Sequence, residues 1–366
     1  MEELEEGQGS RFDWTLMLTV LALVGLGLLN IYSATFHQQN QHFISKQIMS
    51  FGIGAGVFAV IMLFDYRIFE RIAYLAYGLN LVALSLVPFV GTLRYGARRW
   101  INFGFFSWQP SETMKIMMIL AVAKYFHSKN QVRKMGLKEL IVPVLMIAVP
   151  GLMTIAQPDL GTGGHMMIVG ATILLFVGIR PKILIWTALM GIVSFPVFWQ
   201  YGLKEYQKDR IVTFMNPTRD PKGEGYNAIQ SLIAVGSGEV TGKGFTRGTQ
   251  TQLEFTPEGH TDFIFTVLAE EWGFLGSILL FSLYLIFFYR MIGIASHAND
   301  IFGAVLGVGV VALMASQVFI NTAMVMGMFP IVGIPLPLMS YGGTSMLTAM
   351  VSLGLLMNVG YRRTLF

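Results

Sequence analysis

Four ionisable residues between positions 98 and 115 have the chemistry to bind an anion. Arg98 and Arg99 are adjacent, and Glu112 and Lys115 follow after a short polar stretch. The planar guanidinium group donates to two phosphate oxygens at once, so the arginines indicate an anionic ligand such as a phosphate. The alternative is an ordinary interfacial anchor, in which arginine side chains extend to water from a membrane surface lined by tryptophans.

Three polar stretches have the composition of helix starts. Pro110 is expected to open one helix with Ser111 as its cap, and Asp159, in the stretch AQPDLGT, is expected to cap another. Thr261 is the candidate cap of a third helix, which would put Asp262 in the first turn, where the helix dipole favours an acid. Capping alone would explain any one of these stretches.

The third stretch holds more polar residues than capping needs. Glu258, His260 and Asp262 alternate just ahead of an apolar run. Their oxygen and nitrogen atoms would suit a metal ion, but three ligands at alternate loop positions are a weak signal. Glu270 follows two turns later, about 12 Å deeper at 1.5 Å per residue, where an acid is costly unless protein or water surrounds it.

A fourth polar feature interrupts the apolar pattern near the end of the chain. The stretch GIPLPLMSYGGTSML, residues 333–347, contains two prolines, Ser340 and two adjacent glycines between two apolar runs. Non-helical backbone at membrane depth is tolerated only where protein or a cavity shelters it. The sequence therefore predicts either a re-entrant element that lines a cavity or a tight hairpin outside the membrane.

The elements that must position these residues are membrane helices. Of 366 residues, 54% are hydrophobic and only 13% are charged, whereas a soluble domain carries about 25% charged residues. The predicted fold class is therefore an all-α polytopic membrane protein. The formal net charge is only +4 and no basic tract is interleaved with aromatic residues, so nucleic acid is not an expected partner. The absence of cysteine excludes disulfides and thiolate metal sites.

Ten apolar runs are long enough, or nearly so, to cross a bilayer. The first is interpreted as a retained helix and not a cleaved signal peptide, because it lacks a basic leader. The eighth is too long for one perpendicular crossing, so it should project into water or break near Gly273. The predicted spans are 14–35, 46–64, 70–90, 112–127, 139–156, 163–180, 182–201, 263–290, 301–326 and 341–361.

Basic residues near the span ends predict the orientation. With the N-terminus in the cytoplasm, thirteen lysines and arginines lie inside and five lie in the short outside loops. Both termini are then cytoplasmic, and a large extracytoplasmic loop with seven basic and seven acidic residues joins the seventh and eighth helices. A single domain is expected, made of a tail (1–13), helices one to seven (14–201), the large loop (202–261), helices eight to ten (262–361) and a second tail (362–366).

The polar stretches and their order resemble the SEDS family (shape, elongation, division and sporulation) over essentially the whole chain. The stretches that carry the resemblance are GARRWINFG, AQPDLGT, GEGYNAIQSLIAVGSG, KGFTRGTQTQLEFTPEGHTDFIF, AEEWGFLG and GIPLPLMSYGG. The stretch GTQTQLEF is more like the elongation branch than the division branch. Glu239 and Gly259 depart from the expected pattern, which puts the local loop conformation in question.

This resemblance implies a ten-helix peptidoglycan glycosyltransferase in the bacterial cytoplasmic membrane. Its substrate would be lipid II, a disaccharide-pentapeptide on undecaprenyl pyrophosphate, polymerised into glycan strands at the outer face during cell elongation. Its partners would be a class B penicillin-binding transpeptidase, other proteins of the elongation complex and membrane lipid.

The resemblance also assigns roles to the polar residues. Asp262 falls on the catalytic aspartate of the motif P-E-x-H-T-D and would be the general base for the 4-hydroxyl of the acceptor sugar. Arg99 and Lys115 fall on basic residues of the family and would stabilise the departing pyrophosphate. The rest of the expected substrate-binding set is Arg98, Glu112, Asp159, Glu258, His260, Thr261 and Ser340.

The expected base has a complication of its own. A helix N-terminus stabilises the charged carboxylate of Asp262 and makes it a weaker base, whereas burial beside Glu258 would act in the opposite direction. A divalent cation that bridges Asp262 and the diphosphate would be a second way to reconcile a weakly basic carboxylate with the reaction. No other cofactor is expected.

Two other functions compete with the enzyme. A transporter that flips the lipid-linked precursor would place ionisable residues near mid-bilayer on broken helices, and Glu270 and the broken element near 335–343 favour it. Against it, the acids and bases gather at one face and no internal repeat is found. An inert scaffold for other cell-wall proteins would not need polar residues beneath the long loop.

Overall fold

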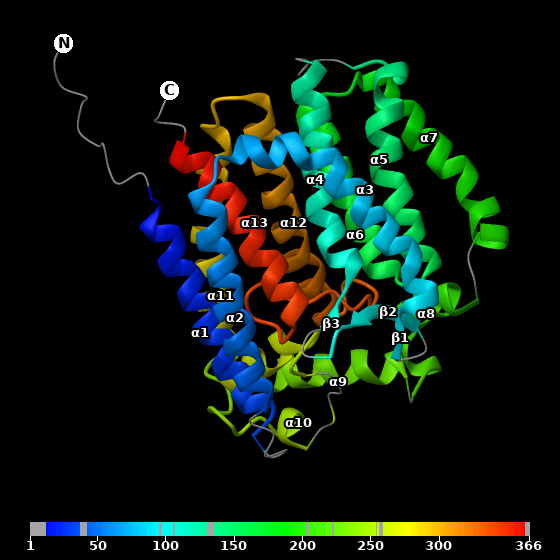
Figure 1. The fold of residues 1–366 in the computed structure, drawn as a ribbon. Coiled ribbons are helices and arrows are strands. Elements are labelled where there is room, and N and C mark those ends of the chain that lie inside the picture. Colours follow the sequence, from blue (N-terminus) through cyan, green and yellow to red (C-terminus); the bar gives the residue numbers. More distant parts are fainter. Residues whose placement is uncertain are drawn as a thin grey trace, which may run out of the picture.

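Long apolar helices make up most of the protein in the computed structural model (Figure 1). The structure describes residues 12–36, 42–94, 97–104, 107–129, 135–202, 205–221, 223–253, 255 and 259–362. The long helices are α1 (Trp14–Ala34), α2 (His42–Leu63), α3 (Tyr66–Val90), α4 (Pro110–Lys129), α5 (Leu137–Ala156), α6 (Leu160–Val177), α7 (Pro181–Val197), α11 (Ile264–Ser296), α12 (Ile301–Val325) and α13 (Gly343–Arg362).

These helices fall on the ten predicted spans and confirm the predicted fold class. Within the described ranges, eight of them are long and apolar enough to cross a membrane. The other two are α7, which has 17 residues, and α4, which carries Glu112, Lys115, Lys124 and Lys129. Composition thus supports eight crossings directly, and the charged residues of α4 require an environment made by protein.

Burial separates central helices from peripheral ones. The most apolar stretches of α12 and α13 are 67% and 72% buried, whereas those of α2 and α3 are only 22% buried. The peripheral helices instead expose large apolar side chains, such as Leu75 and Leu79 of α3 and Leu285 of α11. An apolar outer surface of this kind suits contact with lipid, and it leaves the interior as the place for polar side chains.

The two ends of the bundle differ (Figure 1). The start of α1 and the end of α13 lie at one end, and ion pairs between Arg290 and Asp13 and between Arg362 and Asp65 join helices there. A small antiparallel sheet lies at the other end, with β2 (Ala97–Asn102) between β1 (Thr92–Arg94) and β3 (Ser107–Trp108).

The predicted loop 202–261 has secondary structure of its own at the same end as the sheet (Figure 1). A π-helical turn (Phe198–Gly202) extends α7, and a 3₁₀ turn (Pro217–Arg219) follows α8. The helices of this region are α8 (Glu205–Met215), α9 (Glu224–Ser237) and the single turn α10 (Thr249–Gln252).

Of the two outcomes that its length predicted, projection into water or a break near Gly273, helix α11 shows the break at Gly273. The backbone there has φ 63° and ψ −154°, a conformation open to glycine, and the break leaves helical amides and carbonyls without partners inside the helix. The segment 239–244 supplies those partners. Lys243 and Gly244 donate to the carbonyls of Glu270 and Glu271 at 3.0 Å each, and Phe274 and Leu275 donate to the carbonyls of Glu239 and Val240 at 2.9 and 3.1 Å.

The chain between α12 and α13 is non-helical and enters the protein. Ile334, Leu336, Leu338 and Met339 are at most 3% exposed, so protein surrounds this backbone. Of the two predictions for residues 333–347, the structure shows the re-entrant element, here defined as residues 326–342 and called the re-entrant segment. Burial in protein is the condition under which such backbone is tolerated in a membrane protein.

Candidate active site

Three consecutive carbonyl groups around the expected base accept hydrogen bonds from distant parts of the chain. The amide of Tyr341 donates to the carbonyl of His260 at 2.9 Å. Ser340 Oγ donates to the carbonyl of Thr261 at 2.7 Å, and Asn321 Nδ2 donates to the carbonyl of Asp262 at 2.7 Å. The backbone of residues 260–262 is therefore held at every residue by α12 and the re-entrant segment.

The side chain of Asp262 is half-buried and lies against Gly333. A Cβ at position 333 would lie 3.2 Å from Asp262 Oδ2, and Gly333 has φ +66°, where L side chains are disfavoured. Glycine thus leaves room for the carboxylate beside the re-entrant segment. The half-exposed side chain can still be reached from outside the protein.

The predicted cap at Thr261 is wrong. Helix α11 begins at Ile264, its N-cap is Phe263, and no side chain bonds to the first turn there. The reason is that residues 259–263 form turns whose carbonyls are bonded to α12 and the re-entrant segment. Asp262 consequently lies before the helix and not in its first turn, so the dipole acts on it less than expected.

His260 contributes an aromatic contact. Its ring centroid lies 4.6 Å from that of Phe43 on α2 and 5.7 Å from that of Tyr341. Glu258, the remaining member of the alternating triplet, lies outside the described residues. Within the described part of the chain, no group of three His, Asp or Glu side chains is arranged to hold a metal ion.

Arg99 and Asp159 form the second part of the site. Arg99 Nη1 lies 3.9 Å from Asp159 Oδ1, and Arg99 Nη2 donates to the carbonyl of Pro158. Asp159 also caps α6 as predicted, because its Oδ1 accepts from the amide of Thr162 at 3.2 Å. Arg98, the next residue along β2, instead donates to the carbonyl of Pro88 at 3.0 Å, since successive strand residues point to opposite faces.

Glu112 and Lys115 are paired with each other inside the protein. Lys115 Nζ lies 2.7 Å from Glu112 Oε1, and the two residues are 1% and 5% exposed. The cap predicted at Ser111 is wrong, because α4 already begins at Pro110 and Ser111 lies within the helix. The structure thus places the lysine in the bundle, while Arg99, with 28% of its side chain exposed, is accessible.

A backbone contact joins the two parts of the site. A Cβ at Gly161 would overlap the carbonyl oxygen of Val332, so the first turn of α6 touches the re-entrant segment directly. Gly161 is two residues from Asp159, and Val332 adjoins Gly333, the neighbour of the Asp262 carboxylate. The Arg99–Asp159 pair and Asp262 therefore lie on the same side of the molecule and share the re-entrant segment.

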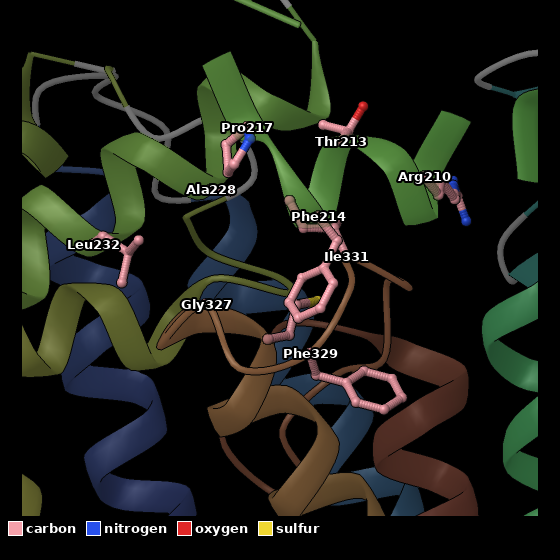
Figure 2. Close-up of a pocket in the computed structure, with 10 residues that line it drawn as sticks. Arg210, Thr213, Phe214, Pro217, Ala228, Leu232, Gly327, Phe329 and Ile331 are labelled. Atoms are coloured by element: carbon pink, nitrogen blue, oxygen red, sulfur yellow. The ribbon is translucent and has the colours of Figure 1, made fainter. Parts of the chain in front are cut away.

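Three residues of the same segment, Gly327, Phe329 and Ile331, help to line a pocket. Its lining residues come from α8, α9, the end of α12 and the chain just after it (Figure 2). Most of the lining is apolar, including Phe214, Leu232, Phe329 and Ile331, and Arg210 adds a cationic group. Ile331 is two residues from Gly333, so the pocket adjoins the site through the re-entrant segment.

Glu270 is fully buried and bonded to the 202–261 segment. Its Oε1 lies 2.8 Å from Lys243 Nζ and accepts from the amide of Gln250 at 2.8 Å, and its Oε2 accepts from the amide and hydroxyl of Thr251 at 3.1 and 2.9 Å. The depth calculated for a straight helix from Asp262 does not apply, because α11 begins only at Ile264 and Lys243 and Gln250 of the 202–261 segment reach Glu270. Glu270 thus holds the segment in place and no longer favours a transport pathway.

Sequence reasoning missed Asn321 and Gly333. Asn321 is one of two side-chain amides, with Gln317, within the apolar run 301–326, and a polar residue in a membrane helix is a signal that could have been used. Gly333 was seen only as part of a motif, because its closeness to Asp262 depends on two segments that are far apart in sequence.

The fold is that of a polytopic membrane protein, and the candidate site residues Arg99, Asp159 and Asp262 lie toward one end of its helix bundle. The family model FtsW/RodA/SpoVE, described as "Cell cycle protein", matches residues 14–365. The chain belongs to this family, and the resemblance inferred from its polar stretches is confirmed.

Individual relatives agree with the family. "Peptidoglycan glycosyltransferase MrdB" of Escherichia coli (strain K12) is 37% identical over 352 residues, which cover 96% of this chain and 94% of that protein. One similar solved structure is a chain from a peptidoglycan synthase complex that coordinates polymerization and crosslinking, with a TM-score of 0.84, 27% identity and coverage of 96% of this chain and 98% of that one. The rod shape determining protein RodA of Thermus thermophilus has a TM-score of 0.72, 26% identity and the same coverage.

Proposed function

We propose that this chain is a peptidoglycan glycosyltransferase that polymerises lipid II, with Asp262 as the general base. Family membership and the names of the relatives support the reaction class. The observation that carries the assignment of the base is the position of Asp262. Its carbonyl and that of Thr261 accept hydrogen bonds from Asn321 and Ser340, its carboxylate lies in the space left by Gly333, and its side chain is half-exposed.

The reaction requires removal of one proton and departure of one anion. Asp262 takes the proton of the acceptor sugar hydroxyl as that oxygen forms a bond to the anomeric carbon of the donor sugar. The bond between this carbon and the diphosphate oxygen breaks, and the diphosphate leaves with the electron pair. Donors near the leaving oxygens stabilise the charge that develops there.

Arg99 is the cation best placed to receive the diphosphate. Its ion pair with Asp159 is long, at 3.9 Å, and its side chain is partly exposed, so a diphosphate can replace Asp159 as its partner. Lys115 and Glu112 act from inside the bundle, where the lysine charge is paired with the glutamate. Ser340 and Thr261 act through the hydrogen bond that Ser340 Oγ donates to the Thr261 carbonyl. The proposed binding set is completed by Arg98, Glu258 and His260.

The location and the partner follow from the same proposal. The site lies at the end of the bundle away from the start of α1 and the end of α13 (Figure 1), which puts it on the extracytoplasmic side if both termini are cytoplasmic. Lipid-linked substrate would reach it within the membrane, and the apolar pocket beside Ile331 suits part of an isoprenoid chain. The partner is a class B penicillin-binding transpeptidase, in keeping with the similarity to a synthase complex.

The test uses the purified chain with its transpeptidase partner and labelled lipid II. Asp262→Asn should lower the rate of polymer formation by roughly 10²- to 10⁴-fold, the usual contribution of a general base, while partner binding is retained. Asp300→Asn is the matched control, since Asp300 caps α12 at the far end of the bundle and Asn also caps well. Polymer formation at the wild-type rate by Asp262→Asn would reject the base, and lipid transfer between leaflets without polymer would identify a transporter.

A further inference from the structure

We propose that Asn321 is a positioning residue for this reaction, which fixes the Asp262 carboxylate by holding the two backbone segments on either side of it. The proposal rests on the function proposed above. Asn321 lies on α12 and has no exposed surface. Its Nδ2 donates to the carbonyl of Asp262 at 2.7 Å and to the carbonyl of Ile334 at 2.8 Å.

The orientation of this amide follows from its partners. Both are backbone carbonyl oxygens, which only accept, so the nitrogen of the Asn321 side chain must face them. Each of its two hydrogens then goes to a different segment of the chain. A carboxylate or an aliphatic side chain at this position would have no proton to donate to either carbonyl.

The two bonded segments are those that determine where the carboxylate lies. One bond holds the peptide of Asp262 itself. The other holds Ile334, the residue after Gly333, and Gly333 is the backbone position against which Asp262 Oδ2 rests. Loss of the Asn321 side-chain amide therefore frees both the backbone of Asp262 and the backbone at Gly333 and Ile334 that its carboxylate lies against.

The other two carbonyl contacts cannot replace this link. Ser340 and Tyr341 hold Thr261 and His260, which precede the base, whereas the Asn321 amide bonds both to Asp262 itself and to Ile334. Displacement of a catalytic group by about 1 Å can cost roughly 100-fold in rate, so a hinge at Asp262 would reduce the chemical step while substrate binding by Arg99 is maintained.

A second asparagine makes the same kind of link away from the site. Asn358 on α13 also has no exposed surface, and its Nδ2 donates to the carbonyls of Ile61 and Phe64 at 2.6 Å each. Those carbonyls belong to the junction of α2 and α3, at the end of the bundle opposite to Asp262. Removal of either amide leaves two backbone carbonyls unbonded, and removal of the Asn358 amide also frees the Tyr66 backbone amide, which donates to Asn358 Oδ1 at 3.2 Å, so its stability cost should be at least as large.

The experiment compares Asn321→Leu with Asn358→Leu in the complex with the transpeptidase partner. Both changes should lower the melting temperature, and Asn358→Leu should lower it at least as much as Asn321→Leu. Asn321→Leu should reduce kcat per folded molecule by roughly 10- to 100-fold, leave KM for lipid II within about threefold, and shift the pH–rate profile. Asn358→Leu should keep the wild-type kcat, KM and pH profile.

Asn321→Asp is the second variant, since it keeps the size of the side chain and replaces the two N–H donors with a carboxyl group that offers one proton at most. Gly333→Ala is the third, since it presses on Asp262 Oδ2 from the other side, and it should also lower kcat more than it raises KM. The proposal is overturned if these variants match Asn358→Leu in kcat per folded molecule, or if they change KM alone. Failure of the proposed function is a different result, in which the wild-type complex makes no polymer.

Discussion

Gly161 and Val332 are in backbone contact, and the carbonyl oxygen of Val332 occupies the space that a Cβ at position 161 would need. This contact seats the turn that carries Asp159 against the re-entrant segment that carries Gly333. Through this contact, the Arg99–Asp159 pair, which is proposed to bind the anion, and the proposed base Asp262 both lie against the re-entrant segment.

The first prediction concerns this contact. Gly161→Ala should push the turn at Asp159 away from the re-entrant segment and lower the polymerisation rate by roughly 10-fold or more, because misplacement of reacting groups by about 1 Å is costly. Gly164→Ala on the same helix is the control, since no atom lies within 4 Å of its added methyl group. The measurement is the polymerisation rate per folded molecule. Equal rates for Gly161→Ala and Gly164→Ala would show that the contact does not position the site.

The second prediction concerns the break in α11. A Cβ at Gly273 would lie 2.4–2.8 Å from backbone atoms of Gly238, Val240 and Gly242, and the positive φ adds about 1–3 kcal/mol of strain for other residues. Gly273→Ala should therefore lower the melting temperature in detergent and release the segment 239–244, detected as faster hydrogen exchange there. Gly293→Ala, on the same helix with open space around its Cβ, should leave both measurements unchanged.

The third prediction separates the two adjacent arginines. Arg99→Ala should raise KM for lipid II by roughly 10-fold, since charge-assisted hydrogen bonds contribute about 1.5–3 kcal/mol each. Arg98→Ala should raise KM less, because Arg98 lies on the other face of β2 and donates to the carbonyl of Pro88. A steady-state titration of lipid II measures both values, and a larger effect at Arg98 would contradict the proposed role of Arg99.

Much of the fold could be predicted because the bilayer constrains it strongly. Every backbone polar group must be bonded inside a membrane helix, so apolar length alone located the long helices, and the excessive length of one run located the break at Gly273. The Asp159 cap was also predictable, because capping depends on residues close in sequence.

The site could be predicted only in part, because its geometry depends on contacts between distant segments. Thr261 has the composition of a cap, yet its carbonyl is bonded to Ser340, 79 residues away, and the helix begins later. Lys115 has the chemistry to bind a phosphate, yet it pairs with Glu112 inside the bundle. Neither outcome follows from spacing, because tertiary bonds override local preference.

The last prediction concerns the ion pair between Lys243 and Glu270. Glu270 is fully buried, and its carboxylate accepts bonds from Lys243 and from the first amides of α10, so it fixes the chain that leads to His260 and Asp262. Lys243→Met should leave a buried charge without its cation, and breaking such a pair is strongly destabilising even when one partner is partly exposed. Hydrogen exchange of residues 243–253 should accelerate by roughly 10-fold, with polymerisation reduced in parallel.

The reciprocal change gives the control for this pair. Glu270→Gln removes the charge and keeps one of the two acceptor oxygens that the α10 amides use, and the double variant Lys243→Met with Glu270→Gln removes both charges. If the pair acts as a unit, the double variant should exchange no faster than Lys243→Met alone, because the uncompensated carboxylate is gone. Additive effects of the two changes would mean that Lys243 and Glu270 stabilise this segment independently, and the ion pair would then not be the contact that orders the approach to Asp262.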